Sequence, residues 1–270
     1  AATFRERGAR LKALSRSLHG RRDELLELSR ETYGATRSDA KFDVDGASGT
    51  LAWYAGLGER LGDVRWLLDG APEVIGRTPR LVGQHVRTSR LGVAVHINAF
   101  NFPAWGMCEK LAVSLLGGMP ALVKPALATC PVAVRVVEGW AEDGLLGEGW
   151  VSLLVGSAGD LLDHLEAQDV VSFTGSSETA RRVRGHARVV ELGVPVNVEA
   201  DSLNASVLGP DAEPGEPTFE LFISEVARDL VQKAGQKCTA VRRVVVPASH
   251  LQAVMEGLGE RLADVRPGEV

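Results

Sequence analysis

Three side chains in this sequence could together carry out nucleophilic chemistry on a carbonyl group: the thiol of Cys238, the carboxylate of Glu199 and the amide of Asn101. A cysteine thiolate attacks electrophilic carbon, a carboxylate can activate water as a general base, and an amide N–H can stabilise the resulting oxyanion. Cys238 lies in the polar segment GQKCTA, between two apolar-patterned segments. A free cysteine is more often a small buried residue than a nucleophile, so the surroundings of Cys238 must decide between these two interpretations.

Glu199 and Asn101 each have an ordinary structural interpretation beside the catalytic one. Glu199 follows the apolar run PVNV, which predicts partial burial of the carboxylate at a place where a base could be poised, although most glutamates are solvated. Asn101, in NAFNFPAW, falls between a predicted strand and a predicted helix, where asparagine usually caps the helix. Pro103 fits the first turn of that helix because it has no N–H to donate.

Two further segments could bind the ribose or phosphate groups of a nucleotide. In LVKPA, Lys124 ends a predicted strand and could reach a ribose hydroxyl or a phosphate, although a solvated lysine is an equal interpretation. In FTGSSETA, a strand runs into Gly175 and a helix begins at Ser176, whose exposed N–H groups would accept a pyrophosphate. This segment is a weak phosphate signal because it is neither GxGxxG nor a P-loop.

The composition is that of a globular protein that acts on small molecules. With 270 residues, 45% of them hydrophobic, the chain can bury a sizeable core and form more than one domain. Its apolar runs are too short to span a bilayer and its N-terminus has no secretory signal, so we expect no membrane association and a cytoplasmic location. Three cysteines without paired spacing indicate neither a disulfide framework nor a zinc site. The net charge of -5, with dispersed basic residues, argues against a nucleic-acid partner.

Hydrophobic periodicity predicts helices at the N-terminus and alternating strands and helices after about residue 80. Two helices are expected over 4–34 and a third over 47–62. Short apolar runs predict parallel strands at 91–97, 120–124, 150–156 and 169–175, with helices at 103–116, 131–143, 160–165 and 176–186. A later pair of strands, 204–209 and 241–247, flanks a long helix candidate at 216–235. The pattern predicts an α/β fold.

Five motifs, in their order and at their spacing, make this chain similar to the aldehyde dehydrogenase superfamily. They are FNFP at 100–103, VKPA at 123–126, FTGS at 173–176, EADSLN at 199–204 and GQKCTA at 235–240. The resemblance covers nearly the whole chain and implies a Rossmann-type cofactor domain followed by the start of a second α/β domain. It divides the chain into a helical part of the cofactor domain (1–79), a Rossmann-like NAD(P)-binding core (80–208) and the beginning of the catalytic domain (209–270). Because the family's catalytic domain continues well beyond its nucleophile, we expect a chain truncated at both ends.

The resemblance implies a role for each candidate residue. Cys238 attacks the aldehyde, Asn101 and the backbone N–H of Cys238 hold the oxyanion, and Glu199 activates the water that releases the acid. Lys124 would contact the adenosine ribose of the cofactor or its phosphate, and Gly175 and Ser176 would lie against the pyrophosphate. The other expected cofactor-binding residues are Phe100, Ala126 and Leu127. This chemistry needs no metal.

Two positions depart from the family pattern. Leu127 stands where members that prefer NAD commonly place a glutamate, which would repel the 2′-phosphate of NADP; its absence favours NADP, with NAD as the alternative. Ala180 stands where many members continue the phosphate turn to a further glycine, which weakens the assignment of that turn.

The substrate expectation also rests on resemblance. HINAFNFPAWGMCEK, AGDLLDHLEAQDVVSFTGS and NVEADSLNASVLGPD are similar to bacterial family members that oxidise CoA-linked semialdehydes in aerobic benzoate and phenylacetate breakdown. The segment TRSDAKFDVDGASGTLAWYAGLG favours the benzoate branch, and the family implies a homodimer or higher oligomer. Three alternatives stay open. They are an acylating enzyme that passes the thioester to CoA, which Glu199 argues against; a non-catalytic nucleotide-binding relative; and a cysteine hydrolase, for which no histidine motif is found.

Overall fold

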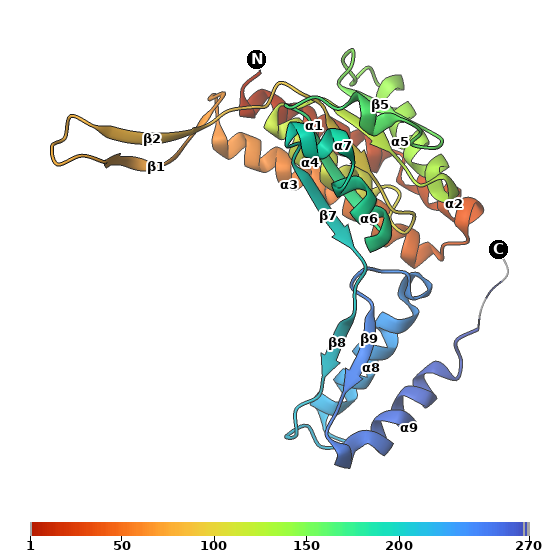
Figure 1. Ribbon diagram of the computed structural model, residues 1–270. Helices are drawn as coiled ribbons and strands as arrows, with labels where there is room; N and C mark the ends of the chain where they lie inside the picture. Colours follow the sequence, from red (N-terminus) through yellow and green to blue (C-terminus); the bar gives the residue numbers. More distant parts are fainter. Residues whose placement is uncertain (1, 267, 269–270) are drawn as a thin grey trace.

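A parallel five-stranded sheet, in the order β5-β4-β3-β6-β7, organises the larger part of the protein (Figure 1). The computed structural model describes residues 2–266 and 268. The strands are β3 (Ala94–Ile97), β4 (Ala121–Lys124), β5 (Val151–Leu153), β6 (Val170–Gly175) and β7 (Val196–Ala200). Along the chain this is the order 3-2-1-4-5 of a doubly wound sheet, in which ligands bind at the carboxyl ends of the strands where the order reverses. That point lies between β3 and β6.

The strands predicted from the alternating pattern are present, and so are all but one of the helices. All four predicted strands pair in parallel, which confirms the α/β prediction. The helices between them are α4 (Trp105–Gly117), α5 (Cys130–Glu142) and α6 (Ser177–Arg184), while the expected helix at 160–165 is only a short 3-10 turn, η2 (Leu161–His164). A further helix, α7 (Ala187–Leu192), was not predicted, because six residues are too few to show a helical period.

Three N-terminal helices form a layer against α4 and α5: α1 (Phe4–Gly20), α2 (Arg22–Tyr33) and α3 (Arg37–Leu61). α3 begins ten residues before its predicted start, where the Thr36 side chain accepts the N–H of Asp39 as an N-cap. Its apolar period is obscured because small and charged residues face the interior. A side chain at Gly46 would put its Cβ 2.4 Å from the Trp105 ring, so close packing of α4 requires glycine there.

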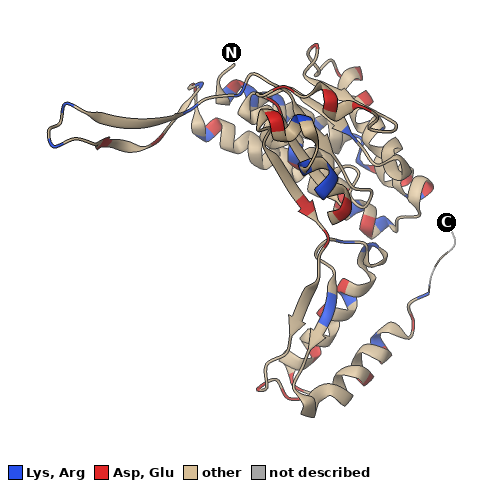
Figure 2. Cartoon of the chain, viewed as in Figure 1, with Lys and Arg blue, Asp and Glu red and all other residues tan. Residues whose placement is uncertain are grey.

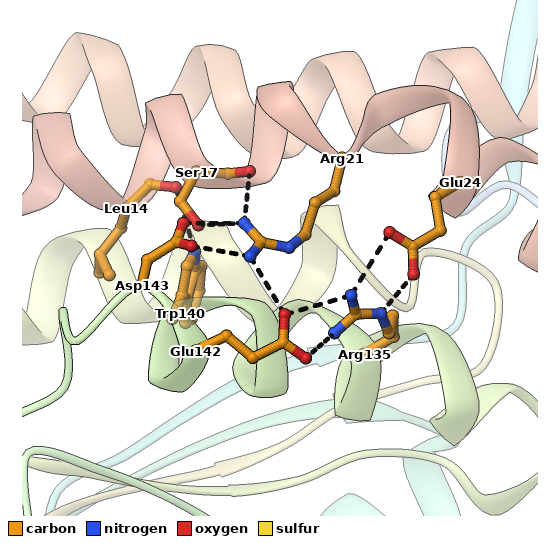
Figure 3. A network of polar contacts seen from close by, with 8 residues as sticks. All are labelled: Leu14, Ser17, Arg21, Glu24, Arg135, Trp140, Glu142 and Asp143. Carbon is orange, nitrogen blue, oxygen red and sulfur yellow. Dashed lines mark hydrogen bonds and ion pairs between the residues drawn. The ribbon is translucent and has the colours of Figure 1, made fainter.

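Ion pairs join the α1–α2 corner to the end of α5 (Figure 3). Arg21 donates to both carboxylate oxygens of Asp143 at 2.8 Å and to Glu142 at 3.1 Å. Arg135 connects Glu142 to Glu24. Acidic and basic residues alternate along the helices of this layer, as the colours in Figure 2 show. Beneath the network Trp140, which is fully buried, donates its indole N–H to the Leu14 carbonyl at 3.0 Å.

We expect this network to make the stability of the protein depend on acid pH. Hydrogen bonds from Arg21 hold the pKa of Asp143 well below its ordinary value, so the stabilisation is present above the ordinary carboxyl pKa, near 4, and is lost as the pH falls. Asp143→Asn should therefore lower the melting temperature of the full-length protein by roughly 2 °C at pH 7, with a smaller difference near pH 3. Glu191→Gln, which changes an exposed carboxylate with no ion pair among the described residues, is the control. Equal shifts for the two variants, or a constant difference with pH, would contradict the assignment.

An antiparallel hairpin projects from the body of the protein (Figure 1). It consists of β1 (Leu67–Val74) and β2 (Val82–Arg87), and it exposes several apolar side chains. The sequence did not predict it, and the expected boundary between residues 79 and 80 falls in its connecting turn. The change in hydrophobic pattern near residue 80 therefore marks the turn of a hairpin. The N-terminal helices end earlier, at Leu61.

A smaller unit at the C-terminal side carries its own two-stranded sheet and core. Its elements are β8 (Asn204–Val207), α8 (Pro217–Val231), η3 (Gln232–Gly235), β9 (Val241–Val245) and α9 (Leu251–Leu262). β8 pairs in parallel with β9 and not with the larger sheet, so residues 204–208 belong to this unit instead of the Rossmann-like core in which they were expected. The change of sheet lies between Ala200 and Asn204. No described helix of the protein is long and apolar enough to cross a membrane.

Candidate active site

Cys238 lies in the turn between η3 and β9, and its side chain is exposed. The other two cysteines differ: Cys108 is fully buried and Cys130 is partly buried. The interpretation of Cys238 as a small core residue is therefore wrong. Gly235, with a φ of 70°, turns the chain three residues before the thiol, a conformation that glycine adopts without steric cost.

Side chains from two distant loops hold the backbone of this turn. Ser202 and Asn204, which follow β7, both donate to the carbonyl oxygen of Cys238, the amide of Asn204 at 2.6 Å. From the loop between β3 and α4, the Nδ2 atom of Asn101 donates to the carbonyl oxygen of Gln236 at 2.7 Å. The structure thus brings Asn101 within two residues of Cys238, although 135 positions separate Asn101 from Gln236 in the sequence.

Two N–H groups at the Cys238 turn have hydrogens left for a further acceptor. Asn101 uses one of its two amide hydrogens on Gln236, which leaves the second for another acceptor. The backbone N–H of Cys238 has no acceptor among the described residues. Asn101 does not cap α4, whose first N–H groups bind the carboxylate of Asp43 instead, so the capping interpretation is wrong.

Glu199 is the next-to-last residue of β7 and lies three positions before Ser202. It lies on β7 beside Thr174 of β6, and its side chain is exposed, which corrects the expectation of partial burial. The reason is that β7 is an edge strand with one covered face. Val196 and Val198 pack against the core on that face, whereas Glu199 lies on the opposite, exposed face. Three residues span about 11 Å at most, so Glu199 is on the same side of the molecule as the Cys238 turn. Its carboxylate has no protein hydrogen-bond partner in the described chain and can bind a water molecule.

Side chains at the end of α8 and the start of η3 hold the residue before Cys238. Lys237 is 7% exposed, and its ammonium group contacts the carboxylate of Asp229 and the Gln232 side chain, the latter at 2.8 Å. The second carboxylate oxygen of Asp229 accepts the N–H of Val241 at 2.5 Å. Sequence reasoning missed this pair, because a helical aspartate and a lysine in a polar turn both resemble solvated residues.

The residues expected at the adenosine side of a cofactor lie at the carboxyl ends of β3 and β4. Lys124 ends β4 beside Ile97, and its ammonium donates to the Pro125 carbonyl at 3.2 Å. The segment Ala126–Leu127 follows, and the Leu127 side chain is 57% exposed. Thr129 donates to the carbonyl of Phe100 at 2.9 Å, which joins this segment to the loop of Asn101.

At the start of α6, where a pyrophosphate is expected to bind, a carboxylate of the protein itself accepts a backbone N–H. Gly175 ends β6, and Ser176 is the N-cap of α6, where its hydroxyl accepts the N–H of Thr179 at 3.2 Å. The N–H of Ser177, however, donates to the carboxylate of Asp201 at 3.2 Å. Asp201 has a left-handed backbone with a φ of 50° and was missed by the sequence analysis. Its negative charge opposes a phosphate at this helix terminus, so the pyrophosphate assignment of Gly175 and Ser176 stays a prediction.

Buried polar atoms at the switch point of the sheet fit a polar ligand. Asn98 follows β3 and is 8% exposed, and neither atom of its side-chain amide has a hydrogen-bond partner. The hydroxyl of Thr174, near the end of β6, is likewise buried without a partner. Leaving a buried polar group unpaired costs about 1–3 kcal/mol, so a polar group that reached these atoms would be stabilised here.

Comparison with known proteins gives a consistent result. A sequence profile described as "Aldehyde dehydrogenase family" matches residues 1–270. 3,4-Dehydroadipyl-CoA semialdehyde dehydrogenase of Aromatoleum evansii is 46% identical over 268 residues, which cover 99% of this chain and 52% of that protein. Alpha-ketoglutaric semialdehyde dehydrogenase of Bacillus subtilis is 27% identical over 270 residues, with 99% and 52% covered.

The same fold occurs in a solved structure. Betaine aldehyde dehydrogenase from Staphylococcus aureus in complex with NAD+ superposes with a TM-score of 0.85 at 23% identity, over 99% of this chain and 50% of that one. The chain spans about half the length of the relatives it matches. The profile match over every residue, together with the 46% identical relative, confirms what the five motifs predicted: the chain belongs to the aldehyde dehydrogenase family.

Proposed function

We propose that the full-length protein oxidises an aldehyde to a carboxylic acid with a nicotinamide cofactor, through a thiohemiacetal and a thioester on Cys238. The observation that carries this proposal is the convergence of three loops on one exposed thiol: Asn101 binds the turn of Cys238, and Ser202, three residues after Glu199, binds the carbonyl of Cys238 itself.

Each residue has one task in this reaction. The Cys238 sulfur attacks the carbonyl carbon, and the amide of Asn101 with the N–H of Cys238 stabilises the oxyanion that forms. When bound, a nicotinamide cofactor would supply the acceptor for the hydride that the same carbon loses. Glu199 then takes a proton from water, whose oxygen attacks the thioester, and the Cys238 thiolate leaves as the acid is released.

The acylating alternative needs no hydrolytic base, because free CoA attacks the thioester directly. The exposed, unpaired carboxylate of Glu199 beside the Cys238 turn therefore supports hydrolysis. Steady-state assays with and without free CoA separate the two, since CoA should leave the rate of a hydrolytic enzyme unchanged.

For the substrate we propose a CoA-linked semialdehyde from aerobic aromatic-ring degradation, with the benzoate branch preferred. The support is the 46% identity to an enzyme named for such a substrate, together with the sequence segments that resemble this subgroup. A panel of free and CoA-linked aldehydes, assayed with the full-length protein, tests this. Equal kcat/KM for the free and CoA-linked forms of one aldehyde would contradict it. By family resemblance we also propose a homodimer or a higher oligomer.

For the cofactor we propose NADP, supported by Leu127, whose exposed side chain lies three residues from Lys124. Leu127→Glu would place a carboxylate near the 2′-phosphate, and we expect it to weaken NADP binding by roughly tenfold to a hundredfold, about 1.4–2.8 kcal/mol, with a much smaller effect on NAD. Leu127→Gln, of the same size without the charge, is the matched control. Fluorescence titration of both cofactors measures the effect. Equal losses for NAD and NADP, or a wild-type preference for NAD, would remove Leu127 from the specificity argument.

A further inference from the structure

Three charged side chains are buried together behind the loops that carry Asn101 and Cys238. Asp39 and Asp43 come from α3, and Lys233 comes from η3; their exposed fractions are 9%, 0% and 6%. Charged side chains are almost never buried this deeply unless they are paired. α3 supplies none of the residues assigned above to chemistry or cofactor binding, so its buried charges need another explanation.

Asp43 fixes the chain directly after Asn101. Its two carboxylate oxygens accept the N–H of Trp105 at 2.8 Å and the N–H of Ala104 at 3.1 Å. The pKa of Asp43 is raised to about 6, because the effect of burial exceeds the opposing effects of these hydrogen bonds and of the Lys233 charge. The start of α4, only four residues beyond Asn101, is thus held against α3.

Lys233 connects the other loop to the same place. Its backbone N–H donates to Asp39 at 2.9 Å, and its ammonium lies 4.5 Å from the ring centre of Phe102 and 5.5 Å from that of Tyr33. The ammonium has no hydrogen-bond acceptor in the described chain, and burial lowers its pKa against the opposing charges of the two aspartates. Phe102 adjoins Asn101, and Lys233 precedes Cys238 by five residues.

The backbone at this point is strained. Lys233 and Ala234 have left-handed conformations, with φ of 52° at both residues. Such a conformation is unfavourable for a residue with a side chain and persists only where surrounding contacts hold it. Asp39 supplies such a contact, because its carboxylate accepts the N–H of the first strained residue.

We propose that Asp39, Asp43 and Lys233 form a clamp that sets the separation between Asn101 and Cys238, and so positions the oxyanion donor against the nucleophile. The clamp rests on the proposed function, and its members are positioning residues that touch no reacting atom. The hydrogen bond from Asn101 to Gln236 spans the same two loops, so a shift of either loop moves the donor relative to the thiol. A displacement of about 1 Å can cost a reaction about a hundredfold in rate.

Three variants of the full-length protein test the clamp. Lys233→Met removes the ammonium but keeps the backbone N–H and the chain length, and it should lower kcat about 10- to 100-fold while the Kd for NADP stays within about twofold. Asp39→Ala removes the acceptor of the Lys233 N–H and should lower kcat similarly. Asp39→Asn keeps an oxygen acceptor and should retain kcat within about threefold, because a hydrogen bond and not a charge holds the strained turn. A purely structural role would not produce this split between kcat and cofactor binding, or the rescue by asparagine.

The clamp is overturned if Lys233→Met keeps the wild-type kcat, or if Asp39→Asn loses as much activity as Asp39→Ala. Should Lys233→Met fail to fold, the Asp39 pair still decides between these outcomes. If the wild type oxidises no aldehyde, the proposed function fails. The clamp is then tested by measuring backbone hydrogen exchange. Asp39→Ala should speed exchange in both 99–106 and 233–240, but not in α5; unchanged exchange in either loop would overturn the clamp independently of activity.

Discussion

We expect the Cys238→Ala variant of the full-length protein to lose aldehyde oxidation, with kcat below about a thousandth of the wild-type value, while cofactor binding stays intact. The physical reason is that no other exposed thiol lies in the described chain, and the two N–H groups that would hold the oxyanion converge on this residue. Covalent capture of the substrate should disappear with the activity. Spectrophotometric assay and titration with the cofactor measure both effects.

Cys130→Ala is the matched control, because it makes the same chemical change at a partly buried cysteine at the start of α5. It should keep kcat within about threefold. Residual turnover within tenfold of wild type in Cys238→Ala would show that the nucleophile is elsewhere.

Glu199→Gln should uncouple the two halves of the reaction. Without a carboxylate to take a proton from water, the variant should form about one equivalent of reduced cofactor in a rapid burst and then stall, with steady-state kcat lowered at least about a hundredfold. Stopped-flow absorbance at the reduced nicotinamide band measures burst and steady state together. Glu191→Gln, at an exposed glutamate of α7, should leave both unchanged.

Two results would contradict the role of Glu199. A variant without a burst would place Glu199 before the thioester, in hydride transfer or in activation of the thiol. If the wild type reached full turnover only when free CoA was added, acyl transfer to CoA, and not hydrolysis, would complete the reaction.

The strands and helices that position the site could be predicted where one physical signal dominated. β4 and β6 are short apolar runs that end in Lys124 and Gly175, and the pattern placed both within a residue or two of their observed ends. The five motifs identified the candidate residues, because their order along the chain does not depend on knowing the contacts between them. Such local signals carry most of the α/β prediction.

Contacts between distant segments could not be predicted in this way. Asp43 is fully buried, yet in the sequence it stands among charged residues that read as a solvated helix surface, and only the packing of Ala104 and Trp105 against α3 explains it. The exposure of Glu199 follows from the edge position of β7, which depends on strand order. Strand order also decides that β8, which begins at Asn204, pairs with β9 and not with the larger sheet.

The central claim is that Cys238 carries the acyl intermediate, and mass spectrometry of the Glu199→Gln protein tests it most directly. The full-length variant is mixed with NADP and a CoA-linked semialdehyde, quenched in acid within the burst and digested. We predict one acyl group per chain, on the peptide that contains Cys238, in an amount equal to the reduced cofactor formed and removable by hydroxylamine as a thioester. Reduced cofactor without any acyl group on Cys238, or an acyl group on a different residue, would contradict the claim.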